Sequence, residues 1–460
     1  MVYSELLFFL GVMPVSVMLS FLDRSAEYKN LILIITSAVF VSWGKPMWCL
    51  LMFASVIPEY LIGLGIGRTR INSRPAASLL LGLDLVMNLG IFFLLANNAL
   101  FPEDSFLHLK AAVIPVGAAW YTAKGFSYCF DVYTGRCRCE SNIFCLLTYM
   151  VSFHFLMAGP VIRYGDAEPA IRKRSVTGRM ISDGLDRFII GLGKSVILAP
   201  CFEKIMTAGL DHADRTLAGS WIGMLAFFGQ CWFAFTGLCD MARGLGLLSG
   251  FDFEQNYRDL STGDMLGGFV RSANTSFIKL TEDFFKLFCG DNVFFCAVCT
   301  LIGCTVAALW YKVSMSFAAV GLALGAVLMI ERLIPAKTKK KIPLAVKTVY
   351  VFLLGTLILG GLRFTELSGY KDWLLSLFGS GNEYILTKAL KAVLTENLFL
   401  IIFSFCCVCV PVKKLIGRGV TKIENASAGG YTVMRVGRTL LTGAVLVMCV
   451  ITLAAQNVNV

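Results

Sequence analysis

Long runs of apolar residues follow one another along almost the whole of this 460-residue chain. About twenty apolar residues in a helix cross the hydrocarbon part of a bilayer. We therefore predict an all-α, polytopic integral membrane protein. The candidate spans are residues 5–22, 30–43, 46–66, 78–100, 111–130, 143–160, 184–200, 216–237, 292–310, 314–334, 345–362, 396–411 and 434–455.

Composition supports this assignment and indicates a single unit. Hydrophobic residues make up 57% of the chain and charged residues 15%, whereas soluble domains average about 25% charged residues. The apolar excess extends along the whole length, so we predict one membrane domain over residues 1–460. Several runs are short or contain glycine, and we expect about ten to twelve crossings, with the other apolar segments re-entrant or interfacial. The first run lacks a basic flank and a small-residue cleavage site, which predicts a retained helix.

The net charge of +11 comes largely from short basic segments between the apolar runs. Basic loops tend to remain in the cytoplasm, so these segments are predicted to face inward. They are residues 67–74, 135–142, 171–179, 335–342 and 412–419. The acidic stretch 101–108 is predicted to lie outside. No basic face interleaved with aromatic residues occurs, which argues against nucleic acid as a partner and leaves the lipid bilayer.

Cysteine and glycine patterns favour packing over chemistry. Most of the sixteen Cys residues lie within apolar runs, where the thiol behaves as a small apolar group. Cys137 and Cys139 form a lone CxC motif without histidine or a second pair nearby, so no metal site is predicted. The string GLGLLSG (244–250) lacks the lysine and the preceding strand of a phosphate loop, and we expect it to allow close helix packing.

Two stretches interrupt the apolar pattern. Residues 238–290 are too polar for a span and too apolar for a loop, and their part 269–288 has the spacing of one amphipathic helix. Residues 364–379 form a second short amphipathic segment. Polar segments at membrane depth persist only where protein or water surrounds them. An internal cavity is therefore expected.

Ionisable side chains inside apolar runs are costly and are treated as functional hypotheses. They are Asp84, His154, Asp186, Arg187 and Asp240. Asp186 and Arg187 are interpreted as an interfacial pair. Asp240 and Arg243, one helical turn apart, are either a structural pair or part of a cavity lining. His154 is the only histidine at membrane depth, where a packing role is more frequent than a catalytic one.

Five stretches, in order, resemble sequence elements of the membrane-bound O-acyltransferases (MBOAT), and within them the alginate O-acetyltransferase type. They include IPVGAAWYTAKGFSYCFDVYTGRC, MVSFHFLMAGPVIRYGD and FAFTGLCDMARGLGLLSGFDFEQNY. The full set comprises residues 30–67, 114–137, 150–166, 233–257 and 359–379. The order and spacing agree over about residues 1–380.

The resemblance implies a fold and a reaction class. The fold would place membrane helices, re-entrant segments and interfacial helices around a central cavity. We expect that cavity to be lined by Trp310, Arg271, Ser276, Asp240, Asp283, Arg163 and Tyr164. The reaction would carry an acyl group, acetyl in this type, from a cytoplasmic thioester of coenzyme A or an acyl carrier protein to a hydroxyl of an exported polymer. An extracytoplasmic partner protein is also implied, and no bound cofactor.

The resemblance also exposes a departure at the site of chemistry. The family reads Leu-Trp-His-Gly at the helix junction, where this chain has Leu309, Trp310, Tyr311 and Lys312. A second family histidine corresponds to Asn274 in RSANTS (271–276), and a third falls within LALG (322–325). Acyl transfer to an alcohol needs a base with a pKa near the working pH. Histidine, at about 6.5, meets this need, whereas tyrosine, at about 10, does not.

Three hypotheses follow from this departure. The first is an active acyltransferase with a displaced base, either His154 or Lys312, because a buried lysine has a lowered pKa and can accept a proton. The second is an inactive scaffold or partner-binding subunit, which the loss of the base favours. The third is a conduit for an acyl group or lipid. An interfacial lysine whose side chain reaches the headgroups is the more frequent reading of Lys312.

Overall fold

The computed structural model describes residues 3–22, 25–43, 46–96, 117–156, 160–211, 216–290, 292–311, 314–379, 386–426 and 428–458. Within these ranges every regular element is a helix, which confirms the predicted all-α class. The acidic stretch 101–108 lies outside the described residues, as does part of the candidate span 111–130.

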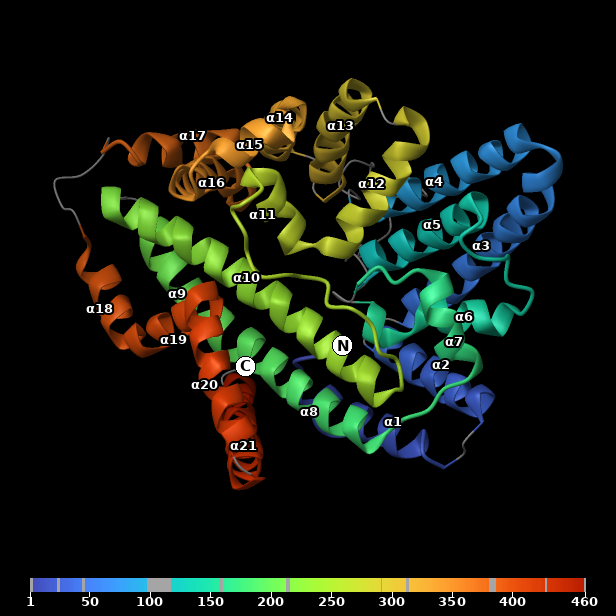
Figure 1. Ribbon diagram of the computed structural model, residues 1–460, viewed down its shortest axis with the longest axis horizontal. Helices are drawn as coiled ribbons and strands as arrows, with labels where there is room; N and C mark the ends of the chain where they lie inside the picture. Colours follow the sequence, from blue (N-terminus) through green and yellow to red (C-terminus); the bar gives the residue numbers. More distant parts are fainter. Residues whose placement is uncertain are drawn as a thin grey trace.

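The N-terminal third forms a group of helices on the right of Figure 1. Ser25 and Asn142 accept backbone hydrogen bonds at the starts of α2 and α6, as N-cap residues do. The elements are η1 (Phe8–Val12), α1 (Met13–Leu19), α2 (Ala26–Ser42), α3 (Pro46–Asn72), α4 (Arg74–Ala96), α5 (Ala118–Thr134), α6 (Ile143–Val151), η3 (Phe153–Phe155) and α7 (Tyr164–Arg172). Their side chains supply most of the largest buried cluster.

Two antiparallel rods cross the middle of the molecule (Figure 1). One is the long helix α10 (Leu217–Leu248), and the other consists of α8 (Gly178–Gly193), the π-turn η4 (Lys194–Leu198) and α9 (Ala199–Leu210). A Cβ added at Gly244 would lie 2.6 Å from the carbonyl oxygen of Gly184 and 2.7 Å from the amide nitrogen of Phe188. The glycine string thus allows the close packing that the sequence predicts.

Replacing Gly244 with alanine is expected to destabilise the protein by about 1–3 kcal/mol, because the new methyl group meets the rigid backbone of α8. Gly82 on α4 provides the matched control, since nothing lies within 4 Å of a Cβ added there. Gly82→Ala should leave the thermal midpoint in detergent unchanged or slightly higher, as alanine favours helix. Equal midpoints for the two variants would contradict this packing argument.

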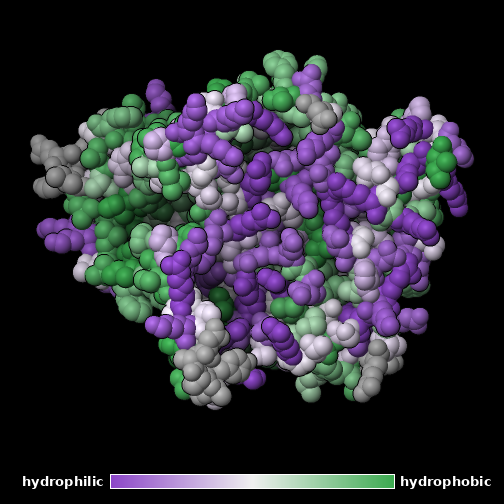
Figure 2. Space-filling model, viewed as in Figure 1, coloured by the Kyte–Doolittle hydropathy of each residue, from purple (hydrophilic) through white to green (hydrophobic). Residues whose placement is uncertain are grey.

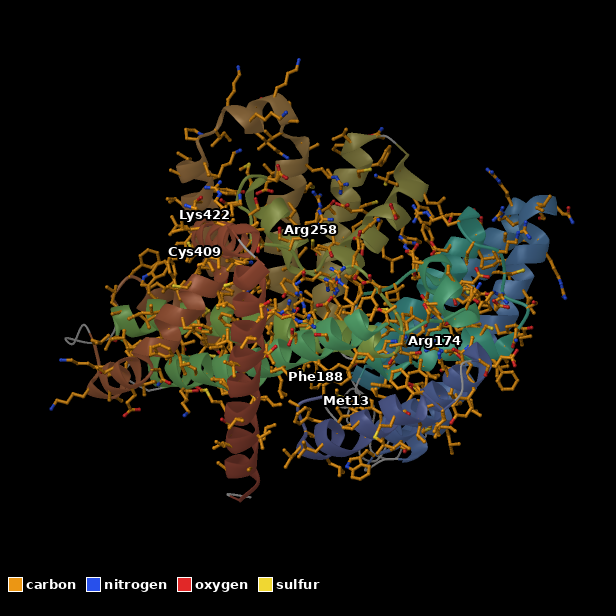
Figure 3. The ribbon with its side chains drawn as sticks, turned by 60° about the horizontal axis from the view of Figure 1, so that its bottom comes forward. Met13, Arg174, Phe188, Arg258, Cys409 and Lys422 are labelled. Carbon is orange, nitrogen blue, oxygen red and sulfur yellow. The ribbon has the colours of Figure 1, made fainter. Side chains whose placement is uncertain are left out.

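The C-terminal half completes the left and upper parts of Figure 1, and α21 projects from the side of the molecule in both ribbon views (Figures 1 and 3). Its elements are α11 (Met265–Ala273), α12 (Thr275–Cys289), α13 (Val293–Tyr311), α14 (Met315–Leu333), α15 (Ala336–Lys341), α16 (Leu344–Leu359), η5 (Gly360–Arg363), α17 (Leu367–Ser376), α18 (Lys388–Glu396), α19 (Leu398–Val408), α20 (Val410–Ala426) and α21 (Ala428–Val458).

The amphipathic segments are present, with one correction. The sequence predicts a single helix over 269–288, whereas the structure has two helices that meet at Asn274, whose φ of −147° and ψ of 86° are not helical. The break has a local cause, because the Asn274 side chain caps the second helix and so replaces backbone hydrogen bonding at that point. The second amphipathic segment is α17, as predicted.

Five described helices are long and apolar enough to cross a membrane, or six if the bent pair α18 and α19 forms one span. The five are Cys49–Asn72, Leu217–Leu248, Met315–Leu333, Leu344–Arg363 and Thr432–Ala455. Phe8–Leu19 and Val293–Leu309 are shorter apolar helices. The chain is therefore a polytopic membrane protein. Among the described residues, fewer helices have the length and apolarity of a span than the ten to twelve crossings that the sequence predicts.

Hydrogen bonds and ion pairs tie several of the basic segments to neighbouring elements. Arg70 donates to the carbonyl of Val132 at 2.8 Å, which joins segment 67–74 to the end of α5, beside segment 135–142. Arg174 donates to the carbonyl of Ser249 at 3.3 Å, and Lys413 pairs with Asp259. Segment 335–342 comes directly after α14. Near the end of α14, Glu331 accepts hydrogen bonds from the backbone amides of Leu266 and Gly267 at the start of α11.

Figure 2 shows that hydrophilic side chains gather over the middle of the viewed face, and that hydrophobic ones surround much of its edge. The cytoplasmic position of the basic segments stays a prediction. The face centres on the chain that links α10 to α11, which crosses in front of α10 (Figure 1).

Candidate functional site

The start of α12 is held by a polar junction between segments far apart in the sequence. Ser276 Oγ donates to Asn256 Oδ1 at 2.5 Å and accepts from the amide of Val161 at 2.9 Å. Asn256, on the segment between α10 and α11, is 1% exposed. Asn274 Oδ1 accepts from the amide of Phe277 at 3.3 Å. Asn274 and Ser276, both predicted site residues, thus have fixed positions on one turn of backbone.

Arg163 is the centre of an ion network beside this junction. Its two terminal nitrogens pair with Asp131 at 2.5 Å and with Asp283 at 2.7 Å. Arg136 reaches the same oxygen of Asp283 at 2.8 Å. The network connects the end of α5, the approach to α7 and the middle of α12. Arg163 and Asp283, predicted separately to line the cavity, therefore contact each other.

The predicted residues Tyr164 and Arg271 have other partners. The Tyr164 hydroxyl donates to Glu140, which also pairs with Arg172 at 2.6 Å. Tyr164 itself is buried. Arg271, which is about half exposed, pairs with Glu282 across the break between α11 and α12 at 2.8 Å. Tyr164 therefore makes its contact in the interior, whereas Arg271 makes its ion pair near the surface.

Asp283 makes the stability of the Arg163 network depend on pH. Burial alone would raise the pKa of its carboxyl, but the hydrogen bond and charge of Arg136 and the charge of Arg163 outweigh burial and hold the pKa below its usual value. A depressed pKa stabilises the folded state above the unfolded value of about 4, and this stabilisation is lost as the pH falls through the folded value. Lowering the pH from 7 to 3 should therefore reduce the thermal midpoint more in the wild type than in Asp283→Asn.

The exposed carboxylate of Asp183, which lies 3.5 Å from Arg179 and 3.8 Å from Arg438, provides the control. Asp183→Asn should retain the acid sensitivity of the wild type. Equal midpoint losses in the wild type and Asp283→Asn would show that the Arg163 network carries no such dependence.

Asp240 lies in a second charged cluster, on α10. Its carboxylate pairs with Lys194 at 2.6 Å and with Arg187 at 2.7 Å, and it accepts from the hydroxyl of Tyr257 at 2.9 Å. Asp240 is 1% exposed. Lys194 opens the π-turn η4, an irregularity that is frequent at functional sites.

This cluster corrects two predicted pairings. Arg187 pairs with Asp240, whereas Asp186 pairs with Arg438 at 2.8 Å, because adjacent residues on a helix do not face each other. Arg243 contacts the exposed Asp252 at 3.8 Å and not Asp240. Asp240 is thus held by the neighbouring rod.

His154 is enclosed by aromatic side chains. Its ring lies 4.0 Å from that of Phe155 and 5.1 Å from that of Phe251, between centroids. The imidazole is fully buried, and neither ring nitrogen has a hydrogen-bond partner among the described residues. Lys124, also buried, donates to the carbonyls of Tyr149 and Met150 at 3.0 and 2.7 Å. The element of His154, η3, packs against α2 and α10.

The remaining predicted residues belong to the junction of α13 and α14. Trp310 and Tyr311 end α13, and nothing is described of their side chains; Lys312 lies outside the described residues. α14 begins with Ser314 as its cap, and Ser316 donates to the carbonyl of Gly361 at 3.1 Å. The junction therefore adjoins η5. α13 itself packs against α14, α12 and α4.

The turned view shows how the polar groups lie together. Nitrogen and oxygen atoms gather around Arg258, between α10 and the helices above it in that view (Figure 3). Sequence reasoning missed Lys194, Asn256 and Tyr257. A signal existed for Lys194, the only charged residue in the predicted span 184–200 after Asp186 and Arg187. Asn256 and Tyr257 follow a glycine-rich helix end, and their partners come from distant segments.

Several bacterial O-acetylating proteins are similar in sequence to this chain. No protein-family profile matches the chain. The probable alginate O-acetylase AlgI of Pseudomonas putida is 28% identical over 367 residues, which cover 77% of this chain and 75% of the relative. The AlgI of Pseudomonas aeruginosa is 28% identical over 368 residues, covering 77% and 70%. The peptidoglycan O-acetyltransferase of Helicobacter pylori is 25% identical over 331 residues, covering 64% and 62%.

These similarities agree with the helical fold and the membrane spans. Several bacterial alginate O-acetylases match over the same large part of the chain. The chain is a multi-pass integral protein of a bacterial membrane. Its sequence is thus similar to alginate O-acetylases and to a peptidoglycan O-acetyltransferase, in agreement with the resemblance to the membrane-bound O-acyltransferases.

Proposed function

We propose that this protein serves the acetylation of a cell-surface polymer, as an acyltransferase whose own transfer step is impaired. The donor would be a thioester of coenzyme A or of an acyl carrier protein, and the acceptor a hydroxyl of an exported polymer. The names of its relatives, which act on alginate and peptidoglycan, support this class of reaction. The net charge of +11 supports it too, because both kinds of donor are anionic and are attracted to a positively charged protein.

The proposed loss of general-base catalysis rests mainly on Asn274. This residue occupies one family histidine position, and its side-chain oxygen caps α12. An amide has no useful proton affinity, and a capping amide is also held in place by its hydrogen bond. Tyr311 holds the other position. Proximity alone supports slow transfer, but general-base assistance is typically worth about 10²–10⁴-fold.

The packing of α12 on α13 supports a shared location for the two positions. Cys289 and Cys299 approach to 3.2 Å between their sulfur atoms, and a Cβ added at Gly303 would lie 2.8 Å from the ring of Phe285. These contacts set an antiparallel register. If this register continued along both helices, the backbone of Tyr311 would lie opposite Phe277, one turn from Asn274.

A second candidate function, slow acyl transfer with a displaced base, is favoured by one observation. His154 is buried with both ring nitrogens unpartnered among the described residues. The unprotonated ring nitrogen has a free lone pair, although burial among aromatic rings disfavours the charged imidazolium form. Lys312 is the other candidate base. An inactive scaffold or partner-binding subunit, or an acyl conduit, is the limiting case of the impaired enzyme.

The test is acyl release from a labelled acetyl thioester by the full-length protein in reconstituted membranes. We expect slow or undetectable turnover with coenzyme A and carrier-protein donors, and no further loss in His154→Ala or Lys312→Ala. Turnover at the rates usual for enzymes, abolished by either substitution alone, would replace the impaired-enzyme proposal with the displaced base.

A further inference from the structure

Three side chains from three different helices meet in the interior of the N-terminal group. Glu59 is on α3, Asp84 on α4 and Cys129 on α5, and their exposed fractions are 1%, 0% and 0%. One carboxylate oxygen of each acid and the cysteine sulfur all lie within 4.8 Å of one another. The position is distinct from the polar junction at Asn274 and from the Asp240 cluster.

Asn88, one turn after Asp84, orients the two acids. Its side-chain nitrogen donates to Glu59 Oε1 at 2.8 Å and to Asp84 Oδ1 at 3.2 Å. Cys129 Sγ lies 3.5 Å from Glu59 Oε2. Asp84 Oδ2 is fully buried and has no hydrogen-bond partner among the described residues. An acceptor in this position needs either a proton or a cation.

No basic side chain faces the group among the described residues. Lys124, the lysine of α5, directs its nitrogen to the carbonyls of Tyr149 and Met150. Arg70, at the end of α3, donates to the carbonyl of Val132. Two carboxyl groups thus share an interior site without a counter-ion, and an uncompensated buried charge costs several kcal/mol.

The backbone makes room for this arrangement. A Cβ added at Gly125 would lie only 2.4 Å from Glu59 Oε1 and 2.7 Å from its carboxyl carbon. Because α5 presents glycine at this point, the Glu59 carboxylate can lie directly against that helix and reach the Cys129 sulfur. Any other residue at 125 would displace it.

We propose that Glu59, Asp84 and Cys129 bind a zinc ion that ties α3, α4 and α5 together. Zinc accepts carboxylate oxygen at about 2.0–2.2 Å and thiolate sulfur at about 2.3 Å, and the 3.5 Å between Cys129 Sγ and Glu59 Oε2 suits two donors to one ion. Calcium and magnesium select oxygen ligands, whereas the sulfur favours zinc. Three protein ligands leave the fourth tetrahedral position to water.

A shared proton is the competing way to neutralise the acids. It would join two of the three donor atoms and would leave the thiol protonated. A zinc ion uses all three, and its binding releases the thiol proton and any proton held between the carboxyls. The hydrogen bonds from Asn88 then serve as the outer contacts that hold metal-bound carboxylates in place.

The experiment measures metal bound by the full-length protein in detergent micelles. After removal of loosely bound metal by dialysis against chelator, we expect about one zinc ion per chain by mass spectrometry. Cobalt loaded in place of zinc should give a thiolate-to-cobalt charge-transfer band. Both signals should be lost in Cys129→Ser and Asp84→Asn. Asn88→Ala should weaken zinc binding by about 10–100-fold.

Cys449→Ser is the matched control, because Cys449 on α21 is as fully buried as Cys129 and has no place in the group. This variant should keep the zinc and the cobalt band. Zinc content that is equal in the wild type and in well-folded Cys129→Ser, with monodisperse elution of both, would overturn the proposal and leave the shared proton. A cobalt band lost in Cys449→Ser would overturn it as well.

Discussion

Replacing Tyr311 with histidine is expected to raise acyl release from the thioester donor by about 10²–10⁴-fold, the contribution of a well-placed general base. The reason is the match of proton affinities. An imidazole with a pKa near 6.5 accepts the hydroxyl proton at neutral pH and later returns it, whereas a phenol with a pKa near 10 is already protonated and does neither. The measurement is labelled acetyl transfer to water or to an added alcohol in reconstituted membranes.

Tyr311→Phe separates base chemistry from packing. It removes the hydroxyl but keeps the ring, and we expect it to leave the slow wild-type rate unchanged. A large loss in Tyr311→Phe would show that the hydroxyl itself contributes. A rate in Tyr311→His equal to that of the wild type, in membranes where both variants fold, would show that the missing imidazole is not what limits transfer.

Restoring the second histidine should behave differently. Asn274→His removes the side-chain cap of α12, which typically costs about 0.5–2 kcal/mol. Asn274→Asp retains an oxygen at the cap and should preserve stability. Combining Tyr311→His with Asn274→His is therefore expected to give a less stable protein, and any gain in rate must be judged against the folded fraction.

The membrane helices and the polar face followed from the sequence for a simple physical reason. Apolar length and basic loops are local properties, and each acts without reference to distant residues. The amphipathic segment 269–288 shows where local patterns fail. Its apolar spacing continues through Asn274, but the side chain there offers the backbone a competing hydrogen bond, and the helix divides.

The charged groups were harder to assign because their partners come from other helices. Asp240 has Arg243 one turn away in sequence, yet the close contact of α10 with the neighbouring rod brings Lys194 and Arg187 to it. Glu59, Asp84 and Cys129 are separated by tens of residues, so no motif spacing marks them. Sequence alone identified Asp84 as costly but could not identify what surrounds it.

The Asp240 cluster also leads to the largest expected effect on stability. Asp240→Ala should destabilise the protein by about 3–5 kcal/mol, because it leaves two cationic side chains beside a buried position without their counter-ion. Lys194 and Arg187 have side-chain exposures of 20% and 29%, so solvent can relieve only part of this cost. The measurement is the thermal midpoint and the denaturant midpoint in the same detergent.

A second substitution tests the cause. In Asp240→Ala with Lys194→Met, one of the stranded charges is removed, and part of the lost stability should return, since breaking a buried pair costs more than replacing it by apolar groups. Asp252→Ala is the control, because Asp252 is 70% exposed and lies 3.8 Å from Arg243. It should change stability by less than about 1 kcal/mol. If the double variant were no more stable than Asp240→Ala, the loss would have to come from the Tyr257 hydrogen bond or from packing, and not from the uncompensated charge.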